Sequence, residues 1–88
     1  MKKLVEVVEV ENEGLVGMMG QNVMVFAMSY IYAGVLSGVN GDCILLENAR
    51  LVYETGPFMK PGYEDAQDLP GKKVYIMKSS IEAFGPGK

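Results

Sequence analysis

The feature that most constrains the fold is a strand-forming segment with two glycines inside it. Residues 30–39 are rich in β-branched and aromatic side chains, as are residues 22–28, and neither segment contains a charge. This composition favours strands. Gly34 and Gly38 interrupt the later segment, and a glycine inside a strand usually marks a bulge or a sharp bend. The two glycines therefore predict a strongly curved strand, of the kind that builds a small barrel.

Turn signals divide the rest of the chain into further strands. Asn40-Gly41 predicts a hairpin turn of type I′, which requires positive φ at both central residues, and Ser79-Ser80 predicts a second tight turn. Residues 56–71 contain three of the four prolines and predict a long, polar, variable connection. The five predicted strands are residues 22–28, 30–39, 42–54, 72–78 and 81–84. We therefore predict an all-β fold, a five-stranded, strongly bent antiparallel small barrel of the SH3-like or OB type.

The first 20 residues form an N-terminal extension whose pattern admits two structures. Val and Glu alternate over residues 2–13, which favours a strand, although Leu4, Val7 and Val8 would also fit one face of a helix. Three glycines in residues 14–20 exclude a long helix, so we expect one helical turn that leads into the first strand. With 88 residues, the chain has the length of a single domain near the lower limit of what folds alone.

The residue types that the chain lacks exclude several kinds of chemistry. It has no His and a single Cys, Cys43, so one chain cannot form a Ser–His or Cys–His catalytic pair or an internal disulfide. A zinc site would have almost no ligands. We therefore expect a protein that is not an enzyme, with no catalytic residue, cofactor or metal. Its net charge of −3 argues against wrapping duplex DNA, which needs a basic face.

Residues 14–41 carry no charge, which leaves a small single-span membrane protein as an alternative. The apolar centre of this segment approaches the length of a membrane span and contains the Gly-xxx-Gly spacing of paired membrane helices. Against it, Ser29, Tyr30 and Tyr32 lie near the middle of the segment, whereas aromatic amphiphiles concentrate at membrane interfaces. An acid also follows the initial lysines too soon for a secretory signal. We therefore expect a cytoplasmic protein with no membrane contact.

Two stretches of the chain combine glycines, aliphatic residues and turn residues in a fixed order. The first is Gly-Val-Leu-Ser-Gly-Val-Asn-Gly-Asp-Cys-Ile-Leu-Leu-Glu-Asn-Ala, at residues 34–49, and the second is Val-Tyr-Ile-Met-Lys-Ser-Ser-Ile, at residues 74–81. The first resembles the first sequence motif of the Sm and Sm-like family, with Gly34, Leu36 and Gly38 at its marked positions, and its spacing is closest to the bacterial Hfq branch. The second resembles the family's second motif, which has a basic and a small residue in the turn before the last strand. The resemblance implies an Sm-like, five-stranded bent barrel.

This resemblance also implies a function and a set of site residues. Proteins of the family are usually closed rings that bind single-stranded RNA, often uridine-rich, around a central pore, in RNA processing or as RNA chaperones; single-stranded DNA is the alternative ligand. Carried over to this chain, the nucleic-acid contacts are Asn40, Asp42 and Cys43 in the loop between the second and third strands, and Lys78 and Ser79 in the later turn.

The chain departs from the family at two of these positions. Asn40 replaces the usual Asp, which preserves hydrogen bonding. Asp42 lies where the family often has an aromatic or His residue that stacks on a base. Because stacking contributes about 1–3 kcal/mol per base, and because an acid repels phosphate, we expect weakened binding or a changed base preference.

The predicted strands also favour assembly on physical grounds. Residues 74–77 contain no charge or proline that would blunt an edge strand. Two unprotected edges on one subunit can pair head to tail and close into a homo-oligomeric ring. The same edges suit a second hypothesis, a structural small-barrel oligomer or assembly adaptor without a nucleic-acid role. In that case Asn40-Gly41 is only a turn and Lys78 only a solvated charge.

Overall fold

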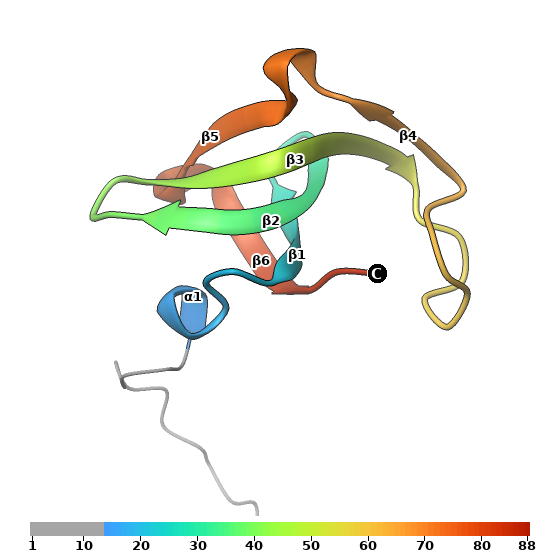
Figure 1. Ribbon diagram of the computed structural model, residues 1–88, viewed down its shortest axis with the longest axis horizontal. Helices are drawn as coiled ribbons and strands as arrows, with labels where there is room; N and C mark the ends of the chain where they lie inside the picture. Colours follow the sequence, from blue (N-terminus) through green and yellow to red (C-terminus); the bar gives the residue numbers. More distant parts are fainter. Residues whose placement is uncertain (1–13) are drawn as a thin grey trace, which may run out of the picture.

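A computed structural model describes residues 14–88, which fold mostly into antiparallel β-strands (Figure 1). The elements in chain order are α1 (Gly14–Gly17), β1 (Asn22–Ala27), β2 (Ile31–Val39), β3 (Cys43–Glu54), β4 (Asp65–Asp68), the 3-10 turn η1 (Pro70–Lys72), β5 (Lys73–Met77), the 3-10 turn η2 (Lys78–Ser80) and β6 (Ile81–Pro86). The predicted all-β class and the single helical turn before the first strand are confirmed. The strand or helix predicted at residues 2–13 lies outside the described residues.

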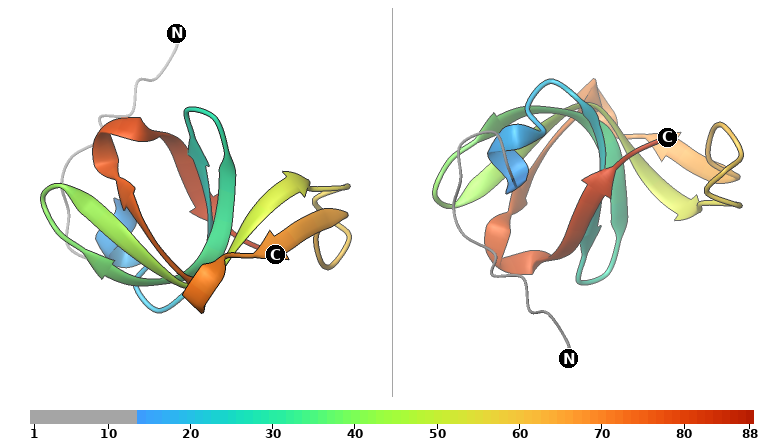
Figure 2. Two further views of the ribbon diagram at one scale, coloured as in Figure 1. Left: turned by 90° about the horizontal axis from the view of Figure 1, so that it is seen from above. Right: turned by 90° about the horizontal axis from the view of Figure 1, so that it is seen from below.

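β3 is the centre of the sheet, because three other strands pair with it. The sheet order is β4-β3-β2-β1-β6, and β5 pairs with β3 off this path. The first half of β3 pairs with β5, from Cys43 opposite Met77 to Glu47 opposite Lys73, and its second half pairs with β4. Figure 2 shows the strands curled around a common centre, with the end of β3 and β4 projecting to one side. Among the described residues, β5 and β6 do not pair with each other, so the sheet is strongly bent but not closed.

The bend of β2 against β3 arises where the glycines predict it. The pairing register shifts once around Gly34 and once just before Gly38. A Cβ atom on Gly34 would lie 2.8 Å from the backbone carbonyl oxygen of Glu47, so a residue without a side chain is required for this close approach. Asn48, on the facing part of β3, has a φ of 51°, a left-handed conformation that Asn tolerates better than most residues. The two strands therefore bend together at this point.

The core lies inside the curl and is built from aliphatic side chains. Ile44 and Leu46 of β3 are fully buried, whereas Cys43 and Leu45 are half-buried, which is the two-residue alternation of a strand. The helical turn α1 contributes Leu15, which packs against the core. The core residues are Val23, Val25, Leu36, Ile44, Leu46, Ala49 and Ile76.

Three details of the sequence prediction are wrong. The chain has six strands instead of five in its described part, because β4 forms within residues 56–71 and pairs with the second half of β3. The β2–β3 turn is not of type I′, since neither Asn40 nor Gly41 has a positive φ. Cys43 begins an apolar run, which predicts a small buried side chain, but it is half-buried, because it occupies the outward position of the alternation.

Within residues 14–88, no helix is long and apolar enough to cross a membrane. The charge-free segment instead supplies α1, β1 and β2, and Val23, Val25 and Leu36 of these strands belong to the core.

Candidate nucleic-acid interface

The β2–β3 turn is organised by the side chain of Asn40. Its Oδ1 atom accepts hydrogen bonds from the backbone N–H groups of Asp42, at 2.7 Å, and Cys43, at 2.9 Å. Its own backbone N–H donates to the Cys43 carbonyl oxygen at 3.0 Å. The side chain thus replaces the backbone geometry of a type I′ turn with an Asx turn. The Nδ2 group, which makes no hydrogen bond to a described residue, remains as a donor.

The β5–β6 connection is a single 3-10 turn, η2. The Ile81 N–H donates to the Lys78 carbonyl oxygen, and the Ser80 hydroxyl donates to the Met77 carbonyl oxygen at 2.9 Å. The Ser80 carbonyl oxygen accepts from the Met28 N–H at 3.0 Å, which attaches η2 to the end of β1. Ser79 is exposed at the apex of this turn.

These two turns, far apart in the sequence, are joined by a hydrogen bond. The backbone N–H of Lys78 donates to the carbonyl oxygen of Asp42 at 2.8 Å, as a continuation of the β3–β5 ladder. Figure 1 shows the β2–β3 turn and the end of β5 on the same side of the molecule. Four of the five residues predicted as nucleic-acid contacts, Asn40, Asp42, Lys78 and Ser79, therefore belong to one polar cluster, which we call the turn cluster.

The turn cluster contains one cation and one anion that are not paired with each other. No ion pair within 4.0 Å and no hydrogen bond involves the Lys78 ammonium group among the described residues, although three other pairs form, Arg50–Asp68, Lys60–Glu64 and Lys73–Glu47. The Asp42 side chain is exposed and the Lys78 side chain is half-buried. The cluster thus offers one ammonium group, an amide donor and a hydroxyl group for contacts with a polar ligand, beside one carboxylate.

An aromatic side chain that the sequence analysis did not assign to the site lies next to the turn cluster. Tyr75 of β5 is 67% exposed and faces Leu45 across the β3–β5 ladder. With Asn40 and Cys43 it lines a groove of about 250 Å³, together with Gly38 and Val39. The sequence contained a signal for this position. Side chains alternate between the two faces of a strand, so the burial of Ile76 implies that its neighbour Tyr75 faces outward.

A second, larger aromatic surface lies at the β1–β2 hairpin. Met28, Tyr30 and Tyr53 are more than half exposed and line an open depression of about 490 Å³ that also includes Glu82. The rings of Tyr30 and Tyr32 meet edge to face with centroids 6.2 Å apart. This contact holds Tyr30 in place at the rim of the sheet.

Within residues 14–88, both ends of the bent sheet leave a strand edge without a partner strand. In this part of the chain, β5 pairs with β3 alone and β6 with β1 alone. Because the Lys78 N–H points toward β3, and because successive N–H groups of a strand point to opposite sides, the N–H of Met77 points toward the free edge of β5. The N–H of Tyr75 points the same way, whereas that of Ile76 belongs to the internal ladder.

Neither a metal site among the described residues nor a similarity to a known protein indicates what the turn cluster binds. Within the described part of the chain, no group of three or more His, Cys, Asp or Glu side chains is placed to hold a metal ion. Comparisons with protein-family models, with curated proteins and with solved structures give no match for this chain.

Proposed function

We propose that this protein is an Sm-like subunit of a closed homo-oligomeric ring that binds single-stranded RNA, and that it does so in the cytoplasm. The observation that carries the proposal is the hydrogen bond between Lys78 and Asp42. It brings together the turns of the two stretches that resemble the family motifs, with exposed Tyr75 beside them. A ligand at this point could meet a cation, hydrogen-bonding groups and an aromatic face, which are the groups that single-stranded nucleic acid requires.

Assembly through strand edges supports the proposal from a second direction. The free edge of β5 presents the N–H groups of Tyr75 and Met77, and β6 presents the opposite free edge of the same subunit. Pairing of β5 with β6 of the next subunit is a heterologous contact, which closes into a ring when the rotation per subunit permits. The symmetry would place one Lys78 per subunit around a common axis.

The electrostatics of such a ring make the binding local. Each subunit carries a net charge of −3, so long-range attraction of a polyanion is unfavourable. Affinity must then come from Lys78 and from stacking on Tyr75, with Asp42 opposing it. We expect modest affinity that falls steeply with salt, because phosphate contacts release counterions.

Assembly is tested by the mass in solution of the wild type and of two variants at one position. Met77 has a φ of −68°, which the proline ring can adopt. Met77→Pro therefore removes an outward donor with little strain in the chain itself, while Met77→Ala keeps that donor. By light scattering at micromolar concentration, we expect a multimer for the wild type and Met77→Ala and a shift toward monomer for Met77→Pro. A wild-type monomer contradicts the ring.

Nucleic-acid binding is tested by fluorescence anisotropy with labelled uridine-rich RNA, adenosine-rich RNA and single-stranded DNA across a salt series. Lys78→Gln should weaken binding and reduce the salt slope by about one phosphate contact. Lys60→Gln, which removes an ammonium group of the β3–β4 loop that lies 3.9 Å from Glu64, is the matched control and should leave both unchanged. A multimer that binds none of the three probes at low salt would favour the assembly adaptor. The carboxylate of Asp42 in the turn cluster is consistent with that alternative, because it repels phosphate.

A further inference from the structure

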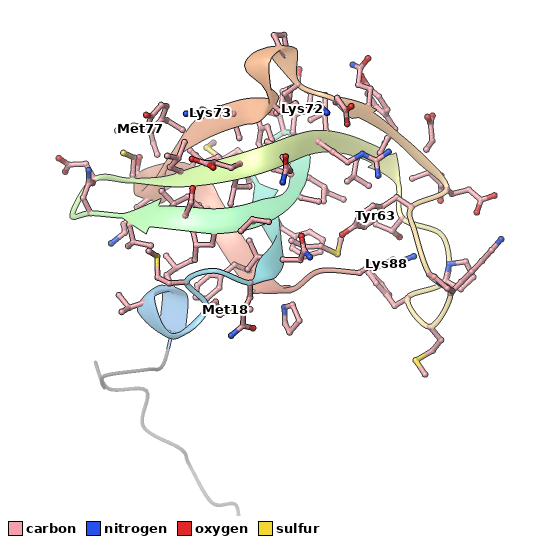
Figure 3. All side chains as sticks on the ribbon, viewed as in Figure 1. Met18, Tyr63, Lys72, Lys73, Met77 and Lys88 are labelled. Atoms are coloured by element: carbon pink, nitrogen blue, oxygen red, sulfur yellow. The ribbon has the colours of Figure 1, made fainter. Side chains whose placement is uncertain are left out.

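One side chain links the part of the chain that projects from the curled sheet to the segment that follows β6. We call residues 50–68 the arm; it comprises the second half of β3, β4 and the loop between them. Figure 2 shows the arm extending away from the other strands. After β6, the chain runs toward the loop of the arm, where Lys88 and Tyr63 lie side by side (Figure 3). Before that point, the Gly87 N–H donates to the Asn22 carbonyl oxygen at 2.9 Å, which anchors the segment on β1.

Three backbone carbonyl groups of the arm surround the ammonium group of Lys88. Its Nζ atom donates to the carbonyl oxygens of Thr55 at 2.5 Å, Pro57 at 2.9 Å and Gly62 at 2.9 Å. An ammonium group has three N–H donors and no acceptor, so these acceptors match it in number. The Tyr63 hydroxyl in addition accepts a hydrogen bond from the Lys88 backbone N–H at 3.2 Å.

Two aromatic rings complete the surroundings of this ammonium group. The Nζ atom lies 5.4 Å from the ring centroid of Tyr63 and 5.8 Å from that of Phe58, within the range of a cation–π interaction. Among the described residues, no carboxylate lies within 4.0 Å of it, and Glu64 of the same loop pairs with Lys60 instead. The contacts are therefore neutral carbonyl groups and ring faces, which suit an organic ammonium better than a divalent metal ion.

The backbone of the loop is shaped for this arrangement. Gly56 and Gly62 have φ values of 69° and 76°, a left-handed conformation that glycine adopts without steric cost. Gly56 lies between the acceptor residues Thr55 and Pro57, and Gly62 itself supplies the third acceptor. A loop whose carbonyl groups converge on one point in this way needs a donor at that point, because converging acceptors repel one another.

We propose that residues 55–63 form a receptor for a primary ammonium group, that is, for a lysine side chain, and that Lys88 is its resident ligand. The site is independent of the turn cluster and of ring assembly. While Lys88 occupies it, the arm is fixed against β1 and β6. Another lysine side chain or a small alkylammonium ion takes the same place only when Lys88 has left, so the arm is fixed only while Lys88 itself occupies the site.

The first test uses the wild-type protein and the chemical reactivity of its lysines. Limited acetylation followed by peptide mass spectrometry compares the rate at Lys88 with the rate at Lys60, whose side chain is 65% exposed. We expect Lys88 to react at least about tenfold more slowly, because its three donors are all bound. Tyr63→Leu should narrow this difference. Equal rates at the two lysines in the wild type overturn the proposal.

The second test empties the site and refills it. Lys88→Gly removes a side chain equivalent to n-butylammonium, which is then titrated at constant ionic strength while the amide NMR signals of Gly56, Gly62 and Tyr63 are followed. We expect saturating shifts or recovered signals in Lys88→Gly and none in the wild type or in Lys60→Gly, where the site stays filled. Tetramethylammonium, which has no N–H donor, and potassium chloride should produce neither change.

Each other result of the titration counts against the proposal. Equal responses of wild type and Lys88→Gly mean that butylammonium binds nonspecifically. An equal response to potassium or tetramethylammonium means that the loop recognises charge and not a primary ammonium group. If Lys88→Gly disorders the loop and butylammonium does not restore it, the loop is no receptor for this ligand.

Discussion

The two halves of β3 belong to the same strand but are stabilised by different interactions. The first half contributes Ile44 and Leu46, both fully buried in the core. In residues 50–54, the part of β3 that lies in the arm, Val52 is the only buried residue. The arm relies instead on pairing with β4, on the Arg50–Asp68 ion pair at 3.5 Å and on the bonds from Lys88.

This difference teaches that one strand can join a region stabilised by apolar burial to a region stabilised by a few polar contacts. Burial is shared among many side chains, so its loss affects the whole domain. Polar contacts of a projecting hairpin are local, and their loss opens that hairpin while the core stays folded. The two lysines differ in the same way between the regions. The ammonium group of Lys78, beside the core half of β3, makes no hydrogen bond among the described residues, whereas that of Lys88, in contact with the arm, makes three.

The largest expected effect comes from the core half of β3. Leu46→Ala should lower the free energy of unfolding by about 2–5 kcal/mol, because it removes buried methyl groups and leaves a cavity. Leu51→Ala, in the half-buried second half of the strand, should cost about 1 kcal/mol. Urea denaturation followed by circular dichroism measures both. Equal losses would show that the two halves do not differ in the way described.

Removal of the Lys88 ammonium should separate the arm from the core. Lys88→Met should lower the local stability of residues 55–63 by about 2 kcal/mol, or roughly 30-fold faster amide exchange, because three charge-assisted hydrogen bonds are lost from a partly exposed site. Exchange at Ile44 and Leu46 should not change. Lys78→Met, the matched control, should leave the arm protected, and unchanged exchange in Lys88→Met would contradict the role of this lysine.

Loss of the aromatic face beside the turn cluster should affect ligand binding and not the arm. Tyr75→Leu should weaken RNA binding at least about fivefold, since stacking contributes about 1–3 kcal/mol per base. Tyr53→Leu removes a tyrosine of similar exposure from the arm and should leave the affinity unchanged. Anisotropy titrations of the two variants decide the point, and similar losses in both would place the binding surface elsewhere.

The smallest effect is expected at the β2–β3 turn. Gly41→Ala should change the free energy of unfolding by less than about 0.5 kcal/mol, because Gly41 lacks a positive φ and a Cβ atom there would meet open space. A type I′ turn would instead cost about 1 kcal/mol or more for the same substitution. Thermal denaturation of the variant and the wild type distinguishes the two geometries.

Local features of the fold could be predicted from the sequence because they depend on neighbouring residues. Strand-forming composition and turn signals predicted β1, β2, β3, β5 and β6. The glycines at 34 and 38 predicted the bend, since only a residue without a side chain permits the close approach of Gly34 to Glu47. The predicted type of the β2–β3 turn was wrong. The Asn40 side chain accepts two backbone hydrogen bonds in this turn, so the turn forms without the left-handed backbone that type I′ requires. β4 was not predicted because its sequence, Asp-Ala-Gln-Asp, has no strand pattern. It becomes a strand because the end of β3 offers it a partner for backbone hydrogen bonds.

By itself, the sequence determined the class of the fold, since strand-forming composition and glycine conformation act over a few residues. Its resemblance to the Sm-like motifs indicated the candidate site residues. Only the tertiary structure decided which of these residues meet. The contact of Lys78 with Asp42 depends on the register of β5 against β3, which is set by the burial of Ile76 opposite Ile44. The ammonium site of the arm depends on three carbonyl groups and two rings around one side chain from the far end of the chain. Backbone carbonyl groups are present in every residue, so no pattern of residue types can indicate where they converge.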